Sequence, residues 1–199
     1  MDDFVGRYTQ KKRILFFTYI NINNQSIMCN YIKFDPKHQD FGRIGSLKGV
    51  YIIALREGCN IPQNAIKPSY RLHDGLRVLY VGQTKQGLNS RIGKMHFNGT
   101  AGRSTLRKSL GCLFGYKLIP RSKNNPNDGK TTFETCDEER LSEWMRDNLI
   151  VFYATEINDI ESVENELIHS YSPPLNLQQV PLDDNMGFRT YLTSLRGNR

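Results

Sequence analysis

The sequence predicts an α+β fold, and two patterns along the chain support this class. Segments rich in β-branched and aromatic residues occupy much of the first half, which is typical of strands. In the second half, apolar residues recur at three- and four-residue spacing, which is typical of amphipathic helices. With 199 residues, 38% hydrophobic and 24% charged, the chain is long enough for one globular domain with an extension.

Residues 1–45 are expected to form a β-rich N-terminal extension. Residues 14–34 predict a β-hairpin, with the arms ILFFTYINI and SIMCNYIKF on either side of a polar turn at residues 23–25. A polar linker with one proline and two glycines follows over residues 35–46. We therefore expect the main domain to span residues 46–180.

Two further strands are expected at the start of this domain. They are GVYIIAL over residues 49–55 and LRVLYVGQ over residues 76–83. They lie on either side of a long polar loop and can pair antiparallel. Within each strand, alternation places Tyr51 on one face with Ile53 and Leu55, and Tyr80 on one face with Leu76 and Val78.

Two short helices should follow these strands. Residues 88–95 form the first, and residues 104–114 form the second. Ser104 is its expected N-cap, with Arg107 and Lys108 on its polar side.

A turn-rich surface loop over residues 121–130 precedes a helix at 137–149 and a strand at 150–157. Asp159 should cap a further helix over residues 160–171, which ends at the sequence Ser172-Pro173-Pro174. The tail, residues 181–199, carries Phe188, Tyr191, Leu192 and Leu195 at helical spacing and is expected to dock as a short helix.

The charge favours an anionic partner. A net charge of +7 and a pI near 9.3 favour nucleic acid, although many basic proteins bind none. The first residues are not a secretory signal, and no apolar run is long enough to span a bilayer, so we expect a cytoplasmic protein. The cysteines contain no CxxC pair, which favours free thiols over a zinc site; they are Cys29, Cys59, Cys112 and Cys136.

One acidic residue stands out in the helix predicted at 160–171. Glu164 lies inside the apolar stripe of this helix, four residues after Ile160 and four before Ile168. Burying a carboxylate without compensation costs at least several kcal/mol. An arginine partner, a raised pKa, a metal ion or a position at the rim of the stripe would each resolve this cost, and the spacing alone does not choose.

Three segments together resemble the GIY-YIG nuclease superfamily. Gly49-Val50-Tyr51 resembles its first motif, and Tyr80-Val81-Gly82, followed nine residues later by Arg91, resembles its second. The segment from Glu164 to Ile168, with the prolines and asparagine of residues 173–176, resembles its third. The resemblance covers residues 49–176 and looks closest to small stand-alone members.

This resemblance implies an antiparallel sheet flanked by helices and an active site on a concave face. The implied activity is metal-dependent hydrolysis of DNA phosphodiester bonds, with DNA as partner and no small-molecule cofactor. Glu164 would hold one Mg²⁺ or Mn²⁺ ion, Tyr51 would orient or deprotonate the attacking water, and Arg91 would clamp the phosphate. The implied catalytic residues are Tyr51, Tyr80, Arg91, Glu164 and Asn176.

Two departures from the family pattern are visible. The loop of residues 56–75 is longer than the usual short hairpin. His96 stands five residues after Arg91, whereas the family often has four, and one extra residue of an α-helix turns a side chain by about 100°. His96 and Lys85 are therefore accessory candidates only.

Basic residues near the motifs are candidates for DNA binding, with the stretch from Arg103 to Lys108 expected to contact the backbone. The alternative for most of them is a solvated basic face. Two other readings remain: a nucleic-acid-binding module of the same fold without catalysis, and a basic structural protein in which the motif residues do not converge. The candidates are Lys94, Arg103, Arg107, Lys108 and Lys117, with Arg121 and Lys123 further out and Lys11, Lys12 and Arg13 beside the hairpin.

Overall fold

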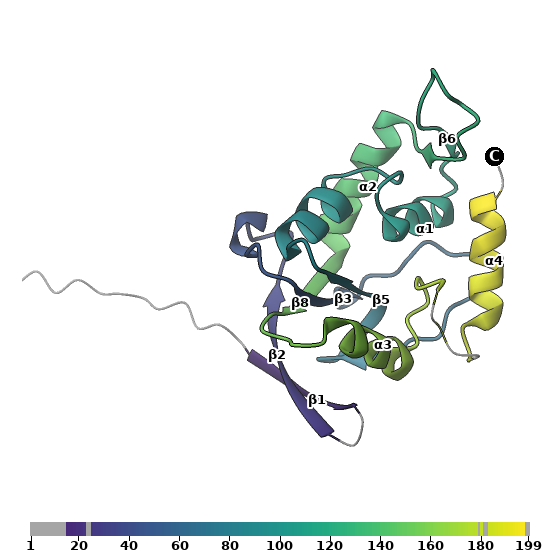
Figure 1. The fold of residues 1–199 in the computed structure, drawn as a ribbon. Helices are drawn as coiled ribbons and strands as arrows, with labels where there is room; N and C mark the ends of the chain where they lie inside the picture. The colour runs from purple at the N-terminus through teal and green to yellow at the C-terminus, as the bar shows by residue number, and fades with distance from the viewer. Residues whose placement is uncertain (1–14, 23–24, 179, 181–182, 198–199) are drawn as a thin grey trace, which may run out of the picture.

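The computed structural model describes residues 15–22, 25–178, 180 and 183–197, with the backbone alone for residues 15–22 and 25–29. The turn expected at residues 23–24 and the basic residues 11–13 lie outside this range. The main feature is a six-stranded sheet in the order β1-β2-β8-β3-β5-β4, in which every neighbouring pair is antiparallel (Figure 1). The predicted α+β class is confirmed.

Five strands agree with the predicted segments, including both arms of the N-terminal hairpin. The short strand at residues 72–73 was not predicted, since it lies in the segment expected to be a polar loop, and neither were the two short strands of a second sheet that bracket the surface loop at residues 121–130. The strand that follows the predicted helix at 137–149 lies in the middle of the large sheet, beside the strand of residues 49–55. The strands are β1 (Leu15–Ile22), β2 (Gln25–Phe34), β3 (Gly49–Leu55), β4 (Leu72–His73), β5 (Leu76–Thr84), β6 (Ile119–Pro120), β7 (Thr131–Thr132) and β8 (Leu149–Ala154).

The predicted helices are present with shifts of a few residues at their ends. A short 3₁₀ turn also forms inside the linker that precedes the main domain. The helices are η1 (Phe41–Arg43), η2 (Asn89–Phe97), α1 (Thr105–Leu113), α2 (Thr135–Asn148), α3 (Ile160–Tyr171) and α4 (Met186–Gly197).

The sheet separates two apolar layers. One face packs against η2, α1, α2 and α4, and its core includes Tyr51 of β3 and Leu106 of α1. The other face packs against α3, through residues such as Ile52 of β3 and Val163 of α3 (Figure 1). Because β3 and β8 are covered on both sides, all their residues are buried, which explains their continuous apolar sequences.

A β-bulge in β5 changes the face on which one motif residue lies. The register pairs Ile53 with Tyr80 but the next residue, Ala54, with Val78, so Leu79 is the extra residue of β5. Val78 therefore packs on the α3 side of the sheet, whereas Tyr80 packs with Tyr51 on the opposite side. The prediction that Tyr80 shares a face with Leu76 and Val78 is wrong, because strict alternation ends at the bulge.

The start of α1 confirms one prediction and corrects another. Ser104 is the N-cap, and its hydroxyl accepts a hydrogen bond from the backbone N–H of Arg107 at 3.1 Å. Arg107, however, does not lie on the polar side of the helix. Its side chain is fully buried, and its guanidinium forms a salt bridge of 2.7 Å with Glu138 of α2. A phosphate cannot reach this guanidinium, so Arg107 does not belong to a DNA-binding surface.

The C-terminal part of the fold follows the predicted pattern. Asp159 caps α3 by accepting a hydrogen bond from the N–H of Ser162. Ser172 ends the helix with a φ of 43°, in the left-handed region. The tail docks as α4, with Phe188 and Leu192 buried against the core that also contains α1.

Two remaining expectations concern cysteines and membranes. Cys59, Cys112 and Cys136 are free thiols, and the side chain of Cys29 lies outside the described range. Among the described helices, none combines the length and the apolar character that a membrane span requires.

Candidate active site

Two glycines allow β3 to sit close to its neighbours. A Cβ at Gly49 would lie 2.1 Å from the carbonyl oxygen of Ala154 on β8, so only glycine fits at this crossing. Gly82 lies directly opposite Tyr51 in the β3–β5 pair, and a Cβ there would lie 2.4 Å from the hydroxyl oxygen of Tyr51. The first motif therefore begins with glycine to pack β3 on β8, and the second ends with glycine to make room for the tyrosine ring.

The hydroxyl of Tyr51 is the centre of a buried hydrogen-bond chain. It lies 2.8 Å from Nε2 of His96 and accepts a hydrogen bond from Nε of Arg91 at 3.3 Å. On the other side of the imidazole, Nδ1 of His96 lies 2.7 Å from the hydroxyl oxygen of Ser104. Burial raises the pKa of Tyr51 above its ordinary value of 10.0, so this phenol does not ionise without a proton acceptor.

His96 is neutral in this chain. Its side chain is fully buried, and burial lowers its pKa well below the ordinary value of 6.5, with the charges of Arg91 and Arg107 acting in the same direction. A neutral imidazole has one nitrogen that accepts a proton. In the tautomer with the proton on Nδ1, Ser104 accepts from His96 and Nε2 faces the hydroxyl of Tyr51 as an acceptor.

The winding of η2 explains how His96 reaches this position. The helix is wound more widely than an α-helix; at its end, the N–H of Asn98 donates to the carbonyl of Gly93, five residues back. A helix with wider turns has about one more residue per turn than an α-helix, so two residues five apart lie near the same side of it. Arg91 and His96, five residues apart, therefore both contact Tyr51. The 100° displacement expected from an α-helix does not occur here.

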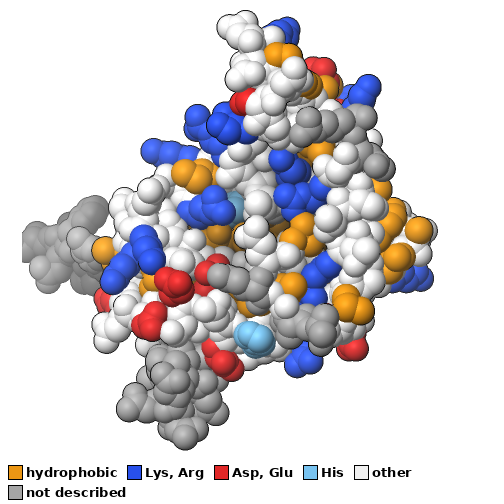
Figure 2. All heavy atoms as spheres, turned by 45° about the vertical axis from the view of Figure 1, so that its right-hand side comes forward, with side chains coloured by type: hydrophobic (Ala, Val, Ile, Leu, Met, Phe, Trp, Pro, Cys, Tyr) orange, Lys and Arg blue, Asp and Glu red, His pale blue; other side chains and the backbone are white. Residues whose placement is uncertain are grey.

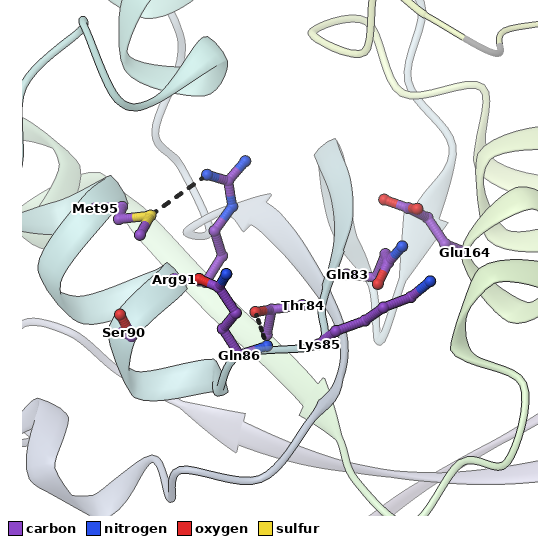
Figure 3. A pocket seen from close by; sticks show the side chains of 8 residues that line it. All are labelled: Gln83, Thr84, Lys85, Gln86, Ser90, Arg91, Met95 and Glu164. Atoms are coloured by element: carbon purple, nitrogen blue, oxygen red, sulfur yellow. Dashed lines mark hydrogen bonds between the residues drawn. The ribbon is translucent and has the colours of Figure 1, made fainter.

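Arg91 extends from η2 into an open cavity of about 520 Å³, called here the Arg91 hollow. Its guanidinium lies on one wall, where Nη1 donates to the carbonyl of Arg103 at 3.4 Å, and the carboxylate of Glu164 lies on the opposite wall (Figure 3). The Glu164 side of the hollow also carries Gln83 and the end of Lys85 (Figure 3). A positive side chain from η2 and a negative side chain from α3 thus face the same cavity.

Glu164 is half-buried and has no ion pair within 4.0 Å among the residues that the structure describes. Burial raises its pKa above the ordinary value of 4.5, while hydrogen bonding with Gln83 and the charge of Arg91 act in the opposite direction. Of the compensations that the sequence left open, an arginine partner within 4.0 Å is absent among the described residues, whereas a position at the rim of the apolar stripe agrees with the half-buried side chain that lines this hollow. Burial also favours a raised pKa, and a bound cation is a further compensation that this position allows.

Asn176 is bound to the backbone of β5. Its Oδ1 accepts from the N–H of Val81 and its Nδ2 donates to the carbonyl of Val81, each at 2.9 Å. The N–H of Leu175 donates to the carbonyl of Leu79 at 3.1 Å. The segment after α3 thus acts as a short substitute strand along the outer edge of β5. Asn176 is placed as a positioning residue for the strand that carries Tyr80.

The other predicted residues lie at different distances from this centre. The ring of Tyr80 is 6.3 Å from that of Tyr51, and its hydroxyl is 3.4 Å from Oγ1 of Thr105. Lys85 lines the Arg91 hollow but pairs with Glu161 at 3.2 Å, where both side chains are exposed. The other basic candidates are exposed at Lys94, Arg103, Lys117, Arg121 and Lys123 and half-buried at Lys108.

A comparison with models of known protein families decides the family. The model of the GIY-YIG catalytic domain matches residues 49–198, about three quarters of the chain. This chain belongs to the GIY-YIG family. Neither the curated proteins nor the solved structures contain a match to it.

GIY-YIG proteins are a nuclease family whose members act on DNA and generally use divalent metal ions. No group of three or more His, Cys, Asp or Glu side chains suited to a metal forms among the described residues. The half-buried, unpaired carboxylate of Glu164 fits a cation that takes one protein ligand and keeps several waters. The fit is thus to a hard divalent ion rather than to zinc, whose sites need three or four protein ligands.

Sequence reasoning missed two residues of this GIY-YIG site. Ser104 was recognised as a helix cap but not as the partner of His96, and Gln83 was not singled out although it contacts Glu164. The position of Gln83 directly after Gly82 of the motif is a usable signal for it. The role of Ser104 depends on the distance between η2 and α1, for which the sequence carries no signal.

Proposed function

We propose that this GIY-YIG protein is a metal-dependent DNA endonuclease that hydrolyses phosphodiester bonds. One observation carries this proposal: Arg91 and Glu164 face a common hollow with opposite charges that are not joined, beside the paired hydroxyl of Tyr51. A site with a free cation and a free anion on opposite walls can hold a phosphate at one wall and a metal ion at the other. The convergence of these three residues argues against an accidental match of the motifs.

Arg91 is proposed to bind the scissile phosphate. A guanidinium donates two parallel hydrogen bonds to phosphate oxygens, which a lysine cannot do. Its Nε contact with Tyr51 fixes the direction of the guanidinium. The charge that develops on the phosphate oxygens in the transition state would therefore meet a donor that is already oriented.

Tyr51 and His96 are proposed to move the proton of the attacking water. The water gives a proton to the phenol oxygen while the phenol proton passes to Nε2 of His96, 2.8 Å away. The water oxygen then bonds to phosphorus as the bond from phosphorus to the leaving oxygen breaks. The raised pKa of Tyr51 supports this coupled transfer, because a free tyrosinate would be costly in its buried position.

Glu164 is proposed to hold one divalent ion, Mg²⁺ or Mn²⁺. When bound, such an ion neutralises charge on the phosphate and assists the leaving oxygen. Tyr80 and Asn176 act on the frame of the site, since Tyr80 packs against Tyr51 and Asn176 fixes β5.

DNA is proposed to lie across the face that carries the hollow. On the face shown in Figure 2, Lys and Arg side chains gather over the upper part, whereas Asp and Glu side chains gather at the lower left. Arg103 is the strongest candidate for a backbone contact, because it is exposed and its carbonyl holds Arg91. Each phosphate contact adds about 0.9 to the salt slope of duplex binding. Lys94, Lys108 and Lys117 are proposed as further contacts.

The test is nicking of supercoiled plasmid with Mg²⁺, comparing the wild type with Glu164→Ala. We expect the wild type to nick and the variant to lose nicking while it keeps DNA binding at low salt. Equal nicking by both proteins would refute the assignment of Glu164. A wild type that binds DNA but never nicks would identify a binding module of the same fold instead.

A further inference from the structure

A second, smaller cavity adjoins the first at Glu164. It has a volume of about 140 Å³ and lies between the end of α3, the start of α1 and the C-terminal helix α4. We call it the Arg196 hollow, after the arginine that α4 contributes. Glu164 lines both cavities, so the two hollows meet at this residue.

The arginines that the fold covers fall into two groups, with and without a carboxylate partner. Arg56, Arg107 and Arg189 each have a carboxylate partner, at 2.6 or 2.7 Å. Arg196 is half-buried, yet among the described residues no carboxylate lies within 4.0 Å of its guanidinium. Its hydrogen bond to Oγ of Ser109 is 3.4 Å long. Arg77 and Arg146 are also half-buried and, among the described residues, have amide or carbonyl partners but no carboxylate. Arg91 shares this unpaired state, and what distinguishes Arg91 and Arg196 is that they line hollows that meet at Glu164.

The walls of the Arg196 hollow carry groups that bind anions. Besides the guanidinium, the hydroxyls of Thr105 and Tyr80 line it, 3.4 Å apart, and both can donate hydrogen bonds. Thr105 is the first residue of α1, where helical N–H groups and the helix dipole favour negative charge. Burial lowers the pKa of Arg196 from its ordinary 12.5. A guanidinium is nevertheless not deprotonated in proteins, so Arg196 is a cation.

We propose that Arg196 binds a second backbone phosphate of the same DNA strand, next to the scissile phosphate held by Arg91. This inference rests on the proposed function and adds a DNA subsite to it. The strand would run from the Arg91 hollow past Glu164 to the Arg196 hollow. The C-terminal helix thus becomes part of the substrate-binding surface rather than only a cover of the core.

The two arginines should then affect different steps. A phosphate that does not react is bound equally in the ground state and in the transition state, so loss of Arg196 raises KM and changes kcat little. Arg91 contacts the phosphate on which charge develops, so its loss lowers kcat.

The experiment measures binding of a labelled 30-base-pair duplex in EDTA, where cutting does not occur, between about 50 and 200 mM salt. Arg196→Gln and Arg196→Met remove the charge, and Arg196→Met also keeps most of the apolar stem in case the glutamine variant does not fold. We expect both to bind about tenfold more weakly at 50 mM salt. Their salt slope should fall by about 0.9, so they lose about 3.5-fold less affinity than the wild type over this range.

Two further variants serve as controls. Arg196→Lys keeps the charge and should restore the wild-type slope. Arg140→Gln removes an equal charge from α2, where Arg140 is exposed and pairs with Asp137 at 3.7 Å, and should leave the slope unchanged. If the wild type binds and nicks DNA but both neutral variants keep its slope, the inference fails and the proposed function stands. If the wild type neither binds nor nicks DNA, both fail.

Discussion

Two regions of this molecule each hold one arginine and one glutamate. In one region the two side chains form an ion pair, and in the other they remain apart. Between α1 and α2, Arg107 and Glu138 are joined at 2.7 Å with both side chains buried. At the edge of β5, Arg91 and Glu164 face each other across a hollow without a bond (Figure 3).

The partners of each carboxylate explain the difference. Both oxygens of Glu138 are occupied: Oε1 accepts from Thr132 and from the N–H groups of Ala101 and Phe133, and Oε2 accepts from Arg107. Such a saturated group holds segments together and has no capacity left for a ligand. Glu164 hydrogen-bonds with Gln83 and, within the part of the chain that the structure describes, has no ion pair, so its charge stays available. An arginine and a glutamate on helices therefore indicate function only where the fold keeps them apart.

The largest expected effect concerns the region in which Arg91 and Glu164 remain apart. Glu164→Gln should lower the rate of plasmid nicking with Mg²⁺ at least about a thousandfold, because the amide does not hold the cation. The midpoint of thermal unfolding should stay the same or rise, since a half-buried charge is removed. A clear loss of stability would show that Glu164 is a structural group like Glu138.

The next largest effect concerns the buried ion pair of Arg107 and Glu138. Glu138→Gln should lower the free energy of unfolding by about 3 kcal/mol, because it leaves Arg107 charged and buried without its partner. Urea denaturation measures this loss. Glu139→Gln, at the exposed neighbouring position, is the matched control and should change stability little. If both substitutions have the same small effect, the buried pair does not stabilise the fold.

A third prediction compares the two arginines. Arg91→Lys should lower kcat about a hundredfold while the protein stays folded, because lysine keeps the charge but loses the two-pronged contact with phosphate. Arg107→Lys should instead lower the thermal midpoint. Single-turnover nicking and thermal denaturation of both variants separate the two roles. Unchanged nicking by Arg91→Lys would mean that its guanidinium does not bind the reacting phosphate.

Asn176→Ala tests the frame of the site. The substitution leaves the N–H and carbonyl of Val81 without partners and should lower stability by about 1–3 kcal/mol. Nicking per folded molecule should fall much less than for Glu164→Gln. Asn158→Ala, at an exposed position, is the control for stability. A collapse of kcat without loss of stability would place Asn176 in contact with the substrate.

The smallest expected change concerns pH. Because the pKa of His96 lies well below 6.5, its ring should stay neutral, with the proton on Nδ1, as the pH falls from 7.5 to about 6. The stability that this neutral ring contributes is complete above pH 6.5 and is lost as the pH falls below that value. Nitrogen-15 NMR of the histidine side chains measures both charge and tautomer. A ring that titrates near 6.5 would contradict the expected effect of burial, and a neutral ring with its proton on Nε2 would contradict the proposed proton path.

The sequence was a good guide where local chemistry decides the structure. The strands at Gly49–Leu55 and Leu76–Thr84 and the helix at Ile160–Tyr171 lie where periodicity and capping predict them. The position of Glu164 inside an apolar stripe was also readable, because helical spacing alone places it there.

The sequence failed where a distant residue or a local irregularity decides. No residue near Arg107 in the sequence shows that the Arg107 guanidinium will be buried in an ion pair with Glu138, 31 residues away. The bulge at Leu79 moves Val78 to the other face of the sheet, and the sequence around it is a continuous apolar run, VLYV, that does not mark the position of a bulge. The five-residue spacing between Arg91 and His96 predicted different sides of a helix, because that prediction assumed an α-helix and η2 is wound more widely.

The segment after α3 also has a consequence for how this protein behaves in concentrated solution. Leu175 and Asn176 occupy backbone groups of β5 that would otherwise be exposed along the sheet edge. An open edge of this kind invites strands of other molecules to pair with it. We therefore expect the motif asparagine to reduce self-association of the chain, apart from any effect on the proposed active site. A variant that loses it should aggregate during expression sooner than one that loses Glu164.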